Sequence, residues 1–194
     1  LLCDHQLFDQ LVPQVAHLIK DGSNNAAKLI EQAFINTDIR ISSNKRVTPA
    51  FIYAALLWPA VEKLAAYYTD RGSSPTYALS KAAGEVIAKQ ISVTAIPRRF
   101  TMPMREIWDL QLQLPRRGGH RAKRLSENPR FRAAYDFILL REQAGEDLAG
   151  LGDWWTQYQE ADEEQKLKMS ELISNTGNRR RRSRRPRHKK DSKD

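Results

Sequence analysis

The chain has 194 residues, a mass of 22.3 kDa and 41% apolar residues, enough for one folded domain with a modest core, which excludes wholesale disorder. Its formal net charge of +9 is concentrated at the end: from Arg179 onward ten cations oppose two aspartates, a net charge of +8, so residues 1–178 carry only about +1. The single cysteine, Cys3, excludes a disulfide framework and a cysteine-based zinc site within the chain, and the apolar run over residues 54–61 is too short to span a membrane.

The spacing of apolar residues predicts an all-α fold. In chain order, we expect helices at residues 3–20, 25–42, 49–70, 75–94, 103–114, 119–126, 130–144 and 147–173. Pro13 and Pro59 lie inside two of these segments and should kink or break them. Gly22, Gly72 and Gly145 stand where helices are expected to stop. No Val/Ile/Thr-rich run alternates between turn signals, so strands are not indicated.

Three helix starts share one signal, a capping residue followed by proline at the first helical position. They are Thr48-Pro49, Ser74-Pro75 and Asn128-Pro129. At that position the missing N–H of proline costs nothing, and the capping oxygen can accept from a later free N–H.

The helical pattern ends near Ser174, and the domain organisation follows from that. We expect an irregular multi-helix body over residues 1–174 and a basic tail over residues 175–194, which lacks apolar anchors and should be disordered when free. The chain begins with Leu rather than Met and carries no signal segment. We therefore expect a cytoplasmic fragment whose upstream part is missing.

No motif predicts catalysis within the chain. A Gly-rich phosphate loop, H-E-x-x-H and G-x-S-x-G are all missing, and the histidines are scattered in sequence at His5, His17, His120 and His188. The acidic run 162–164 has the residue types of a magnesium site, but the stronger interpretation is a solvated helix face balanced by Lys166 and Lys168. The sequence predicts no self-contained active site, no metal and no cofactor in this chain.

A first basic segment surrounds a Gly-Gly turn. We define it here as the arginine segment, and its candidate RNA contacts are Arg116, Arg117, His120, Arg121, Lys123 and Arg124. Spacings of four and three place three of its arginines, at 117, 121 and 124, on one side of the expected helix. Arginine forks bind phosphate oxygens in pairs, and glycine lets a backbone approach closely. The alternative is a polar connector whose arginines pair with Glu127 or Asp109.

The second basic segment is the tail, with candidate contacts at Arg179, Arg180, Arg181, Arg182, Arg184, Arg185 and Arg187. So many cations favour a polyanion through counterion release, and the lack of aromatics favours phosphate contact without base preference. An acidic protein, an anionic membrane surface or a passive solubility tail are the alternatives. A weaker basic pair, Arg98 and Arg99, follows Pro97.

Tryptophans are possible stacking surfaces for bases. Trp108 falls within an apolar helix and is expected in the core. Trp154 and Trp155 are adjacent and point to two faces, so one ring could be exposed, although packing in a core or an interface is the stronger interpretation.

Several short motifs occur in order along the chain: Asn36-Thr37-Asp38-x-Arg40, Arg46-Val47-x-Pro49-Ala50-Phe51, Ala95-Ile96-Pro97-Arg98-Arg99, Ile107-Trp108-x-Leu110-Gln111, Arg116-Arg117-x-Gly119-x-Arg121-Ala122 and Pro129-x-Phe131-Arg132-Ala133-Ala134-Tyr135-Asp136. Together with the arginine tail, they resemble the carboxy-terminal half of the bacterial poly(A) polymerase I family. That family belongs to the nucleotidyltransferase superfamily, which also holds class II tRNA CCA-adding enzymes.

The resemblance implies the end of a helical neck, a body and a tail that hold RNA 3′ ends while a separate head adds AMP from ATP, with Mg²⁺ bound by carboxylates. No D-x-D pair follows Gly22-Ser23 or Gly72-Ser73, so the catalytic residues do not carry over, and we expect this chain alone to be inactive. ATP and Mg²⁺ are implied only for the missing head, which is also an expected partner. The alternatives are a part of a CCA-adding enzyme or a stand-alone helical RNA-binding adaptor.

Overall fold

The computed structural model describes residues 7–182, and side chains for residues 7–174. The described part is all-α, as the sequence predicts, with ten helices and no strand. The helices are α1 Leu7–Leu11, α2 Pro13–Lys20, α3 Asn24–Ser42, α4 Pro49–Asp70, α5 Pro75–Ile91, α6 Arg98–Gln113, α7 His120–Ser126, α8 Phe131–Gln143, α9 Leu151–Glu160 and α10 Glu163–Arg182. None of these helices is both long enough and apolar enough to cross a membrane.

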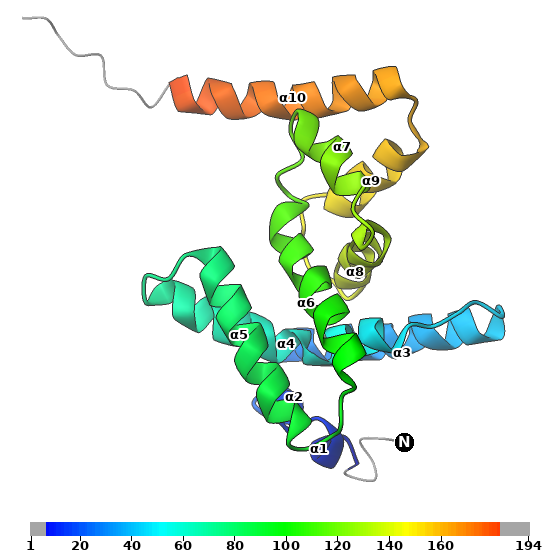
Figure 1. Cartoon of the computed structure of the whole chain (residues 1–194), viewed down its shortest axis with the longest axis vertical. Helices are drawn as coiled ribbons and strands as arrows, with labels where there is room; N and C mark the ends of the chain where they lie inside the picture. Colours follow the sequence, from blue (N-terminus) through cyan, green and yellow to red (C-terminus); the bar gives the residue numbers. More distant parts are fainter. Residues whose placement is uncertain (1–6, 183–194) are drawn as a thin grey trace, which may run out of the picture.

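The helices pack around two apolar cores, which occupy the lower and the upper half of the molecule in Figure 1. The lower core is formed by α1 to α5 together with the first turns of α6, and the upper core by α7 to α9 together with the end of α6. Two helices, α6 and α8, contribute side chains to both cores. Trp108 of α6 is fully buried and donates its indole N–H to the Ala54 carbonyl at 3.1 Å, which confirms its predicted core position.

Local signals placed several helix ends correctly. α4 begins at Pro49 and α5 at Pro75, where Ser74 accepts from the backbone N–H of Tyr77 at 3.4 Å. The third start was wrong by two residues, because Asn128 accepts from the backbone N–H of Arg130 and holds a turn ahead of α8. The predicted glycine stops are confirmed: all three glycines have φ values near +90°, a region that side chains disfavour.

Two prolines behave differently inside expected helices. Of the helix expected over residues 3–20, residues 3–6 lie outside the described residues, and Pro13 divides the rest into α1 and α2. Pro13 stands at the first position of α2, so the predicted break is confirmed. Pro59 does not break α4, which runs continuously through it. Its ring is buried in the lower core, where packing offsets the loss of one backbone hydrogen bond.

Other expected boundaries are wrong as well: α5 ends at Ile91 and not at residue 94, and α9 begins at Leu151 and not at residue 147. α6 begins at Arg98 and not at residue 103, so Pro103 lies on the second turn of the helix. The helix tolerates Pro103 there because only one intrahelical hydrogen-bond donor is lost. The single helix expected over residues 147–173 is divided into α9 and α10 at residues 161–162. There the Asp162 carboxylate accepts from the Gln165 backbone N–H at 2.8 Å, and the Gln165 side-chain oxygen accepts from the Asp162 N–H at 3.3 Å, a reciprocal cap that starts α10.

The last helix continues past the expected end of the body. α10 ends at Arg182, so the backbone of the first four tail arginines, 179–182, is helical. Residues 183–194, which include the candidates Arg184, Arg185 and Arg187, lie outside the described residues.

Candidate nucleic-acid interface

The arginine segment comprises the connection from α6 to α7 and α7 itself, at the end of the upper core that faces α10 (Figure 1). Gly119 sits at φ +60° and ψ −143°, a conformation that favours glycine, and it ends the connection from α6 so that α7 starts at His120. Arg117 therefore precedes the helix, and the prediction that it shares a helical side with Arg121 and Arg124 is wrong for this one residue. Arg121 and Arg124 both lie on α7, three residues apart.

Backbone contacts fix the Gly-Gly turn to α10. The Gly119 N–H donates to the Ser170 carbonyl at 3.0 Å. A Cβ placed on Gly118 would lie 2.8 Å from the Ser174 Oγ, so only glycine allows this close approach. From Ser174, α10 continues to residues 179–182, about 8–12 Å further along its axis. The fold thus brings the arginine segment next to the helix that carries the first tail arginines.

Arg117 is the most enclosed cation of the segment. Its guanidinium lies 4.9 Å from the centre of the Trp154 ring, and its Nε atom is buried with no hydrogen-bond partner. Burial lowers the pKa of Arg117 below its ordinary value, and no carboxylate contributes to that shift. The group is a half-buried cation held on an aromatic face, with most of its hydrogen-bonding capacity unused by protein acceptors.

The other cations of the arginine segment are exposed and almost free of ion pairs. Within residues 7–174, the only one that pairs with a carboxylate is Lys123, at 3.8 Å from Glu163, and both side chains of that pair are largely exposed. The predicted alternative, pairing of the arginines with Glu127 or Asp109, does not occur among the described residues. Exposed contacts of this kind contribute little to stability, so these cations remain available to an anion.

Two arginines near the start of α8 have carboxylate partners. Arg130 binds Glu106 at 2.6 Å, and Arg132 binds Asp136 at 3.0 Å. The acidic run at the start of α10 is likewise balanced, since Glu163 and Glu164 bind Lys166 and Lys168, and this confirms its interpretation as a solvated helix face. Arg130 and Arg132 therefore have carboxylate partners that the arginines of the arginine segment lack, although exposed arginines such as Arg98 and Arg99 also make no ion pair among residues 7–174.

The weaker basic pair does not join the arginine segment. Arg98 and Arg99 are exposed in the first turn of α6, whereas the arginine segment follows the other end of that helix. Sixteen residues of helix separate the two by about 24 Å. Any RNA contact at this pair would be a separate one.

The adjacent tryptophans do not offer a stacking surface. Trp155 is fully buried, and its indole N–H donates to the Leu114 carbonyl at 3.3 Å. Trp154 is half-buried between Tyr158, whose ring is stacked at 5.0 Å, and the guanidinium of Arg117 on the segment side. The packing interpretation is confirmed, and Trp154 supports a basic side chain. Sequence alone missed this support because it depends on α9 packing beside the Gly-Gly turn.

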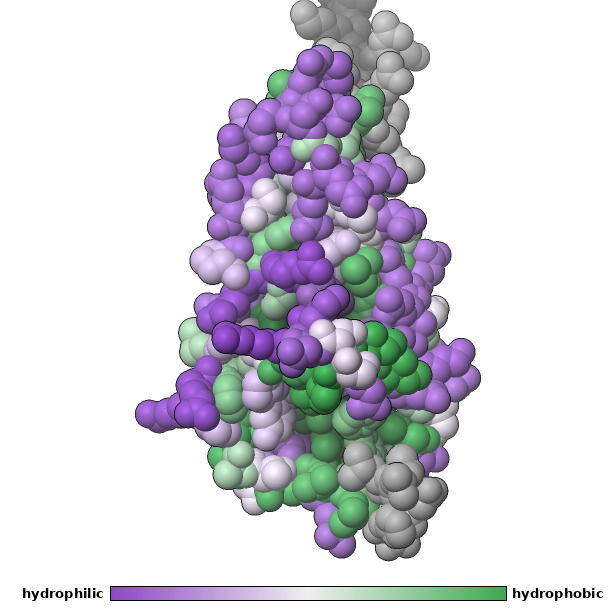
Figure 2. All heavy atoms as spheres, turned by 90° about the vertical axis from the view of Figure 1, so that its right-hand side faces the viewer, coloured by the Kyte–Doolittle hydropathy of each residue, from purple (hydrophilic) through white to green (hydrophobic). Residues whose placement is uncertain are grey.

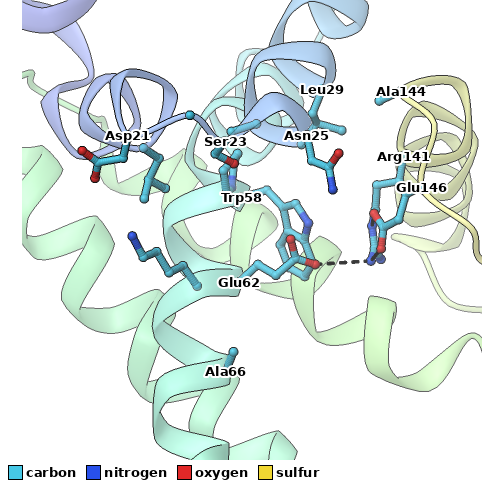
Figure 3. Close-up of a pocket in the computed structure, with 15 residues that line it drawn as sticks. Asp21, Ser23, Asn25, Leu29, Trp58, Glu62, Ala66, Arg141, Ala144 and Glu146 are labelled. Carbon is cyan, nitrogen blue, oxygen red and sulfur yellow. Dashed lines mark hydrogen bonds and ion pairs between the residues drawn. The ribbon is translucent and has the colours of Figure 1, made fainter.

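A separate cleft of about 600 Å³ lies between α2, α3, α4 and the end of α8 (Figure 3). Its one buried cation, Arg141, is 8% exposed and already binds both oxygens of Glu146, the side-chain oxygen of Gln111 at 3.1 Å and Glu62 at 3.6 Å. Burial raises the pKa of Glu62, and the charge of Arg141 partly opposes the rise. Within the described residues, no group of three or more His, Cys, Asp and Glu side chains could hold a metal ion.

The upper and lower halves of the face seen in Figure 2 differ in hydropathy. Hydrophilic side chains dominate its upper half, while the apolar area gathers in the lower half. The exposed large aliphatic residues of α1 and α3 are Leu7, Leu11, Ile35, Ile39 and Ile41. The arginine segment thus belongs to the hydrophilic half.

Comparison with known proteins agrees with this picture. The family described as "Polymerase A arginine-rich C-terminus" matches residues 71–189, which include both basic segments. Poly(A) polymerase I of Escherichia coli O6:H1 is 38% identical over 192 residues, 96% of this chain and 41% of that protein. Poly(A) polymerase I of Salmonella typhi is 38% identical over 188 residues, 94% of this chain and 40% of that protein.

A more distant relative is poly(A) polymerase I of Haemophilus influenzae, 36% identical over 169 residues, 86% of this chain and 37% of that protein. The chain spans about two fifths of the length of the curated relatives it matches. The family resemblance stated from the sequence motifs is therefore confirmed.

Proposed function

The chain belongs to the family of the arginine-rich C-terminus of polymerase A, and from this premise we propose that it is the RNA-binding part of a polynucleotide adenylyltransferase. The whole enzyme would add AMP from ATP to RNA 3′ ends, in mRNA polyadenylation, RNA processing and decay. Bond formation would depend on a catalytic head outside this chain, where ATP and Mg²⁺ would bind. The names of the curated relatives support this proposal over the CCA-adding alternative.

One observation carries the proposal: within residues 7–174, the arginines of the arginine segment have no carboxylate partner, on a surface that the fold holds in place. Folding that desolvates a guanidinium without pairing it is unfavourable unless another partner is gained. A phosphate oxygen supplies such a partner, and a charge-assisted hydrogen bond to it is worth about 1.5–3 kcal/mol. The backbone of RNA presents these oxygens at every nucleotide.

The two basic segments would divide the task. Arg117, Arg121 and Arg124 stand on folded structure, so their contacts have a fixed geometry and can set the path of the strand. The tail would add affinity that depends on charge density and little on base identity. Proximity of α10 to the Gly-Gly turn favours one continuous contact surface.

Binding of the 194-residue chain to a labelled oligo(A), followed by fluorescence anisotropy across a salt series, tests the proposal. Arg121→Ala with Arg124→Ala should weaken binding by roughly tenfold or more. The matched control, Arg130→Ala with Arg132→Ala, removes the same charge from arginines that already have carboxylate partners and should have a smaller effect. Truncation after residue 178 should flatten the log–log salt slope by about 0.7 for each phosphate that the shortened chain no longer neutralises.

Equal losses from the test pair and the control pair would show that net charge, and not this interface, determines binding. If the unaltered chain does not bind oligo(A), the proposed function is wrong. The same preparation incubated with ATP, Mg²⁺ and an RNA primer should leave primer length unchanged. Extension by the pure chain would show that no separate head is required.

A further inference from the structure

Three tyrosines gather at the tip of the α4–α5 hairpin, outside the arginine segment. Tyr67 and Tyr68 lie in the last turn of α4, and Tyr77 lies in the first turn of α5. Tyr67 is 47% exposed and Tyr77 is 60% exposed. The tip projects to the left of α6 in Figure 1, the side toward which the C-terminal end of α10 also projects.

Cations stand beside two of these rings. The guanidinium of Arg71 lies 3.4 Å from the ring centre of Tyr67, and the ammonium of Lys81 lies 4.1 Å from that of Tyr68. The rings of Tyr67 and Tyr68 meet edge to face at 5.5 Å. We call these three tyrosines and two cations the tyrosine patch.

The patch is partly fixed and partly open. The Tyr68 hydroxyl donates to the Glu85 carboxylate at 2.7 Å, and this hydrogen bond is the main cause of the raised pKa of Tyr68. The phenols of Tyr67 and Tyr77 add to the rise, as neighbours would. Within the described part of the chain, the ring of Tyr77 has no ring or cation partner and the residue is largely exposed, so the ring is accessible to a stacking base.

The charges and the surroundings of the patch favour a nucleic acid over a protein. Neither Arg71 nor Lys81 has a carboxylate within ion-pair distance among residues 7–174. Between residues 67 and 81 no large aliphatic side chain is exposed, and the two tyrosines are the only exposed large hydrophobic residues there. Protein interfaces usually have an apolar centre, whereas aromatic rings interleaved with unpaired cations suit a single strand of bases and phosphates.

We propose that the tyrosine patch is a second contact site for single-stranded RNA, where bases stack on Tyr77 and Tyr67 while Arg71 and Lys81 bind the adjoining phosphates. This inference rests on the proposed function and adds to it a contact that binds bases by stacking on their aromatic faces. Every base has such a face, so the contact tolerates sequence, and an adenine-rich strand offers large purine faces. The arginine segment contacts phosphates only, and the two sites therefore differ in what they require of the strand.

Two strands of equal charge separate the two kinds of contact: a labelled oligo(A) and an abasic ribose–phosphate strand with the same number of phosphates. The full 194-residue chain is measured against both at one salt concentration. Tyr67→Leu with Tyr77→Leu should weaken oligo(A) binding roughly 5- to 150-fold for each base that no longer stacks, while binding to the abasic strand changes less than about twofold. The matched control, Tyr67→Phe with Tyr77→Phe, keeps both rings and should bind oligo(A) almost as the unaltered chain does.

Equal weakening on both strands would overturn the stacking role. Unchanged binding of the leucine variant to oligo(A), with the Arg121→Ala and Arg124→Ala losses still present, would also overturn the patch but leave the proposed function standing. A chain that binds neither strand would overturn both. Circular dichroism melting of each variant shows whether the fold is kept, which is expected because both substituted rings are exposed.

Discussion

Two arginines of this chain lie on tryptophan rings at the same distance, and they should respond oppositely to substitution. Arg117 lies 4.9 Å from the centre of the Trp154 ring, and Arg141 lies 4.9 Å from that of Trp58. Only Arg141 is also bound by carboxylates. Substitution of each by methionine keeps an unbranched apolar stem and removes the charge, so Arg141→Met is a matched control for Arg117→Met.

The stability cost of Arg141→Met follows from its partners. The variant loses two hydrogen bonds to Glu146, one to Gln111, the ion pair with Glu62 and the cation–π interaction with Trp58. Breaking a buried ion pair costs about 3–5 kcal/mol. The side chains of Glu62 and Glu146 are 51% and 36% exposed, so water still solvates them and we expect about 2–3 kcal/mol.

Arg117→Met should leave stability within about 1 kcal/mol of the unaltered chain. The cation–π interaction that it removes is worth about 0.5–2 kcal/mol, and the desolvation cost of an unpaired guanidinium is removed at the same time. Affinity for oligo(A) should fall about 10- to 100-fold, because charge-assisted bonds of about 1.5–3 kcal/mol are lost. Arg141→Met should leave that affinity unchanged when measured well below its unfolding midpoint.

Urea unfolding followed by circular dichroism gives the stability of both variants, and fluorescence anisotropy with labelled oligo(A) gives their affinity. Arg141→Met is expected to lower the stability and keep the affinity for oligo(A), whereas Arg117→Met is expected to keep the stability and lower the affinity. If Arg117→Met loses as much stability as Arg141→Met and keeps full affinity, Arg117 is a structural residue. The argument from unpaired cations would then be wrong.

Two further predictions concern the support of the interface and Glu62 in the cleft between α2, α3, α4 and α8. Gly118→Ala places a Cβ 2.8 Å from the Ser174 Oγ, so it should lower the free energy of unfolding by about 1 kcal/mol, measured by urea unfolding. Adding Ser174→Ala should recover most of that stability. An unchanged free energy of unfolding in the single variant would mean that the turn is not held against α10. Burial raises the folded-state pKa of Glu62 above its ordinary value of 4.5, so the contribution of Glu62 to stability falls as the pH rises from about 4.5 through the folded pKa. Glu62→Gln has no such titration, so its stability relative to the wild type should increase over the same pH range. Urea unfolding of both chains at several pH values measures this. A stability difference that does not change with pH would contradict the raised pKa.

Much of the fold could be predicted from the sequence because its signals are local. Proline at a first helical position and glycine at a helix stop act through the backbone of a few neighbouring residues, and α4 has the predicted bounds. The break between α9 and α10 was also encoded locally, by the reciprocal pair Asp162 and Gln165. It was missed because the apolar spacing on both sides of the break suggests one continuous helix.

The candidate site was only partly predictable. Charge density marks the arginine segment, but the absence of partners for its cations depends on which carboxylates the tertiary fold brings near. Trp154 became the support of Arg117 only because α9 packs against the end of α6. The tyrosine patch forms across a helical hairpin, and its signal in the sequence, aromatic residues interleaved with Arg71 and Lys81, is recognisable only once the hairpin is known to close.

The two proposed contact sites are held apart by one helix. The first part of α6 packs in the core beneath the α4–α5 hairpin, and its end belongs to the core beneath the arginine segment. Because α6 is continuous and contributes to both cores together with α8, packed helices connect the two sites. A strand bound at the arginine segment is therefore presented to the tyrosine patch at a raised effective concentration, provided that it is long enough to span the gap. Oligo(A) strands of increasing length should then show a step in affinity in the unaltered chain, and that step should disappear in the variant with leucine at both tyrosine positions.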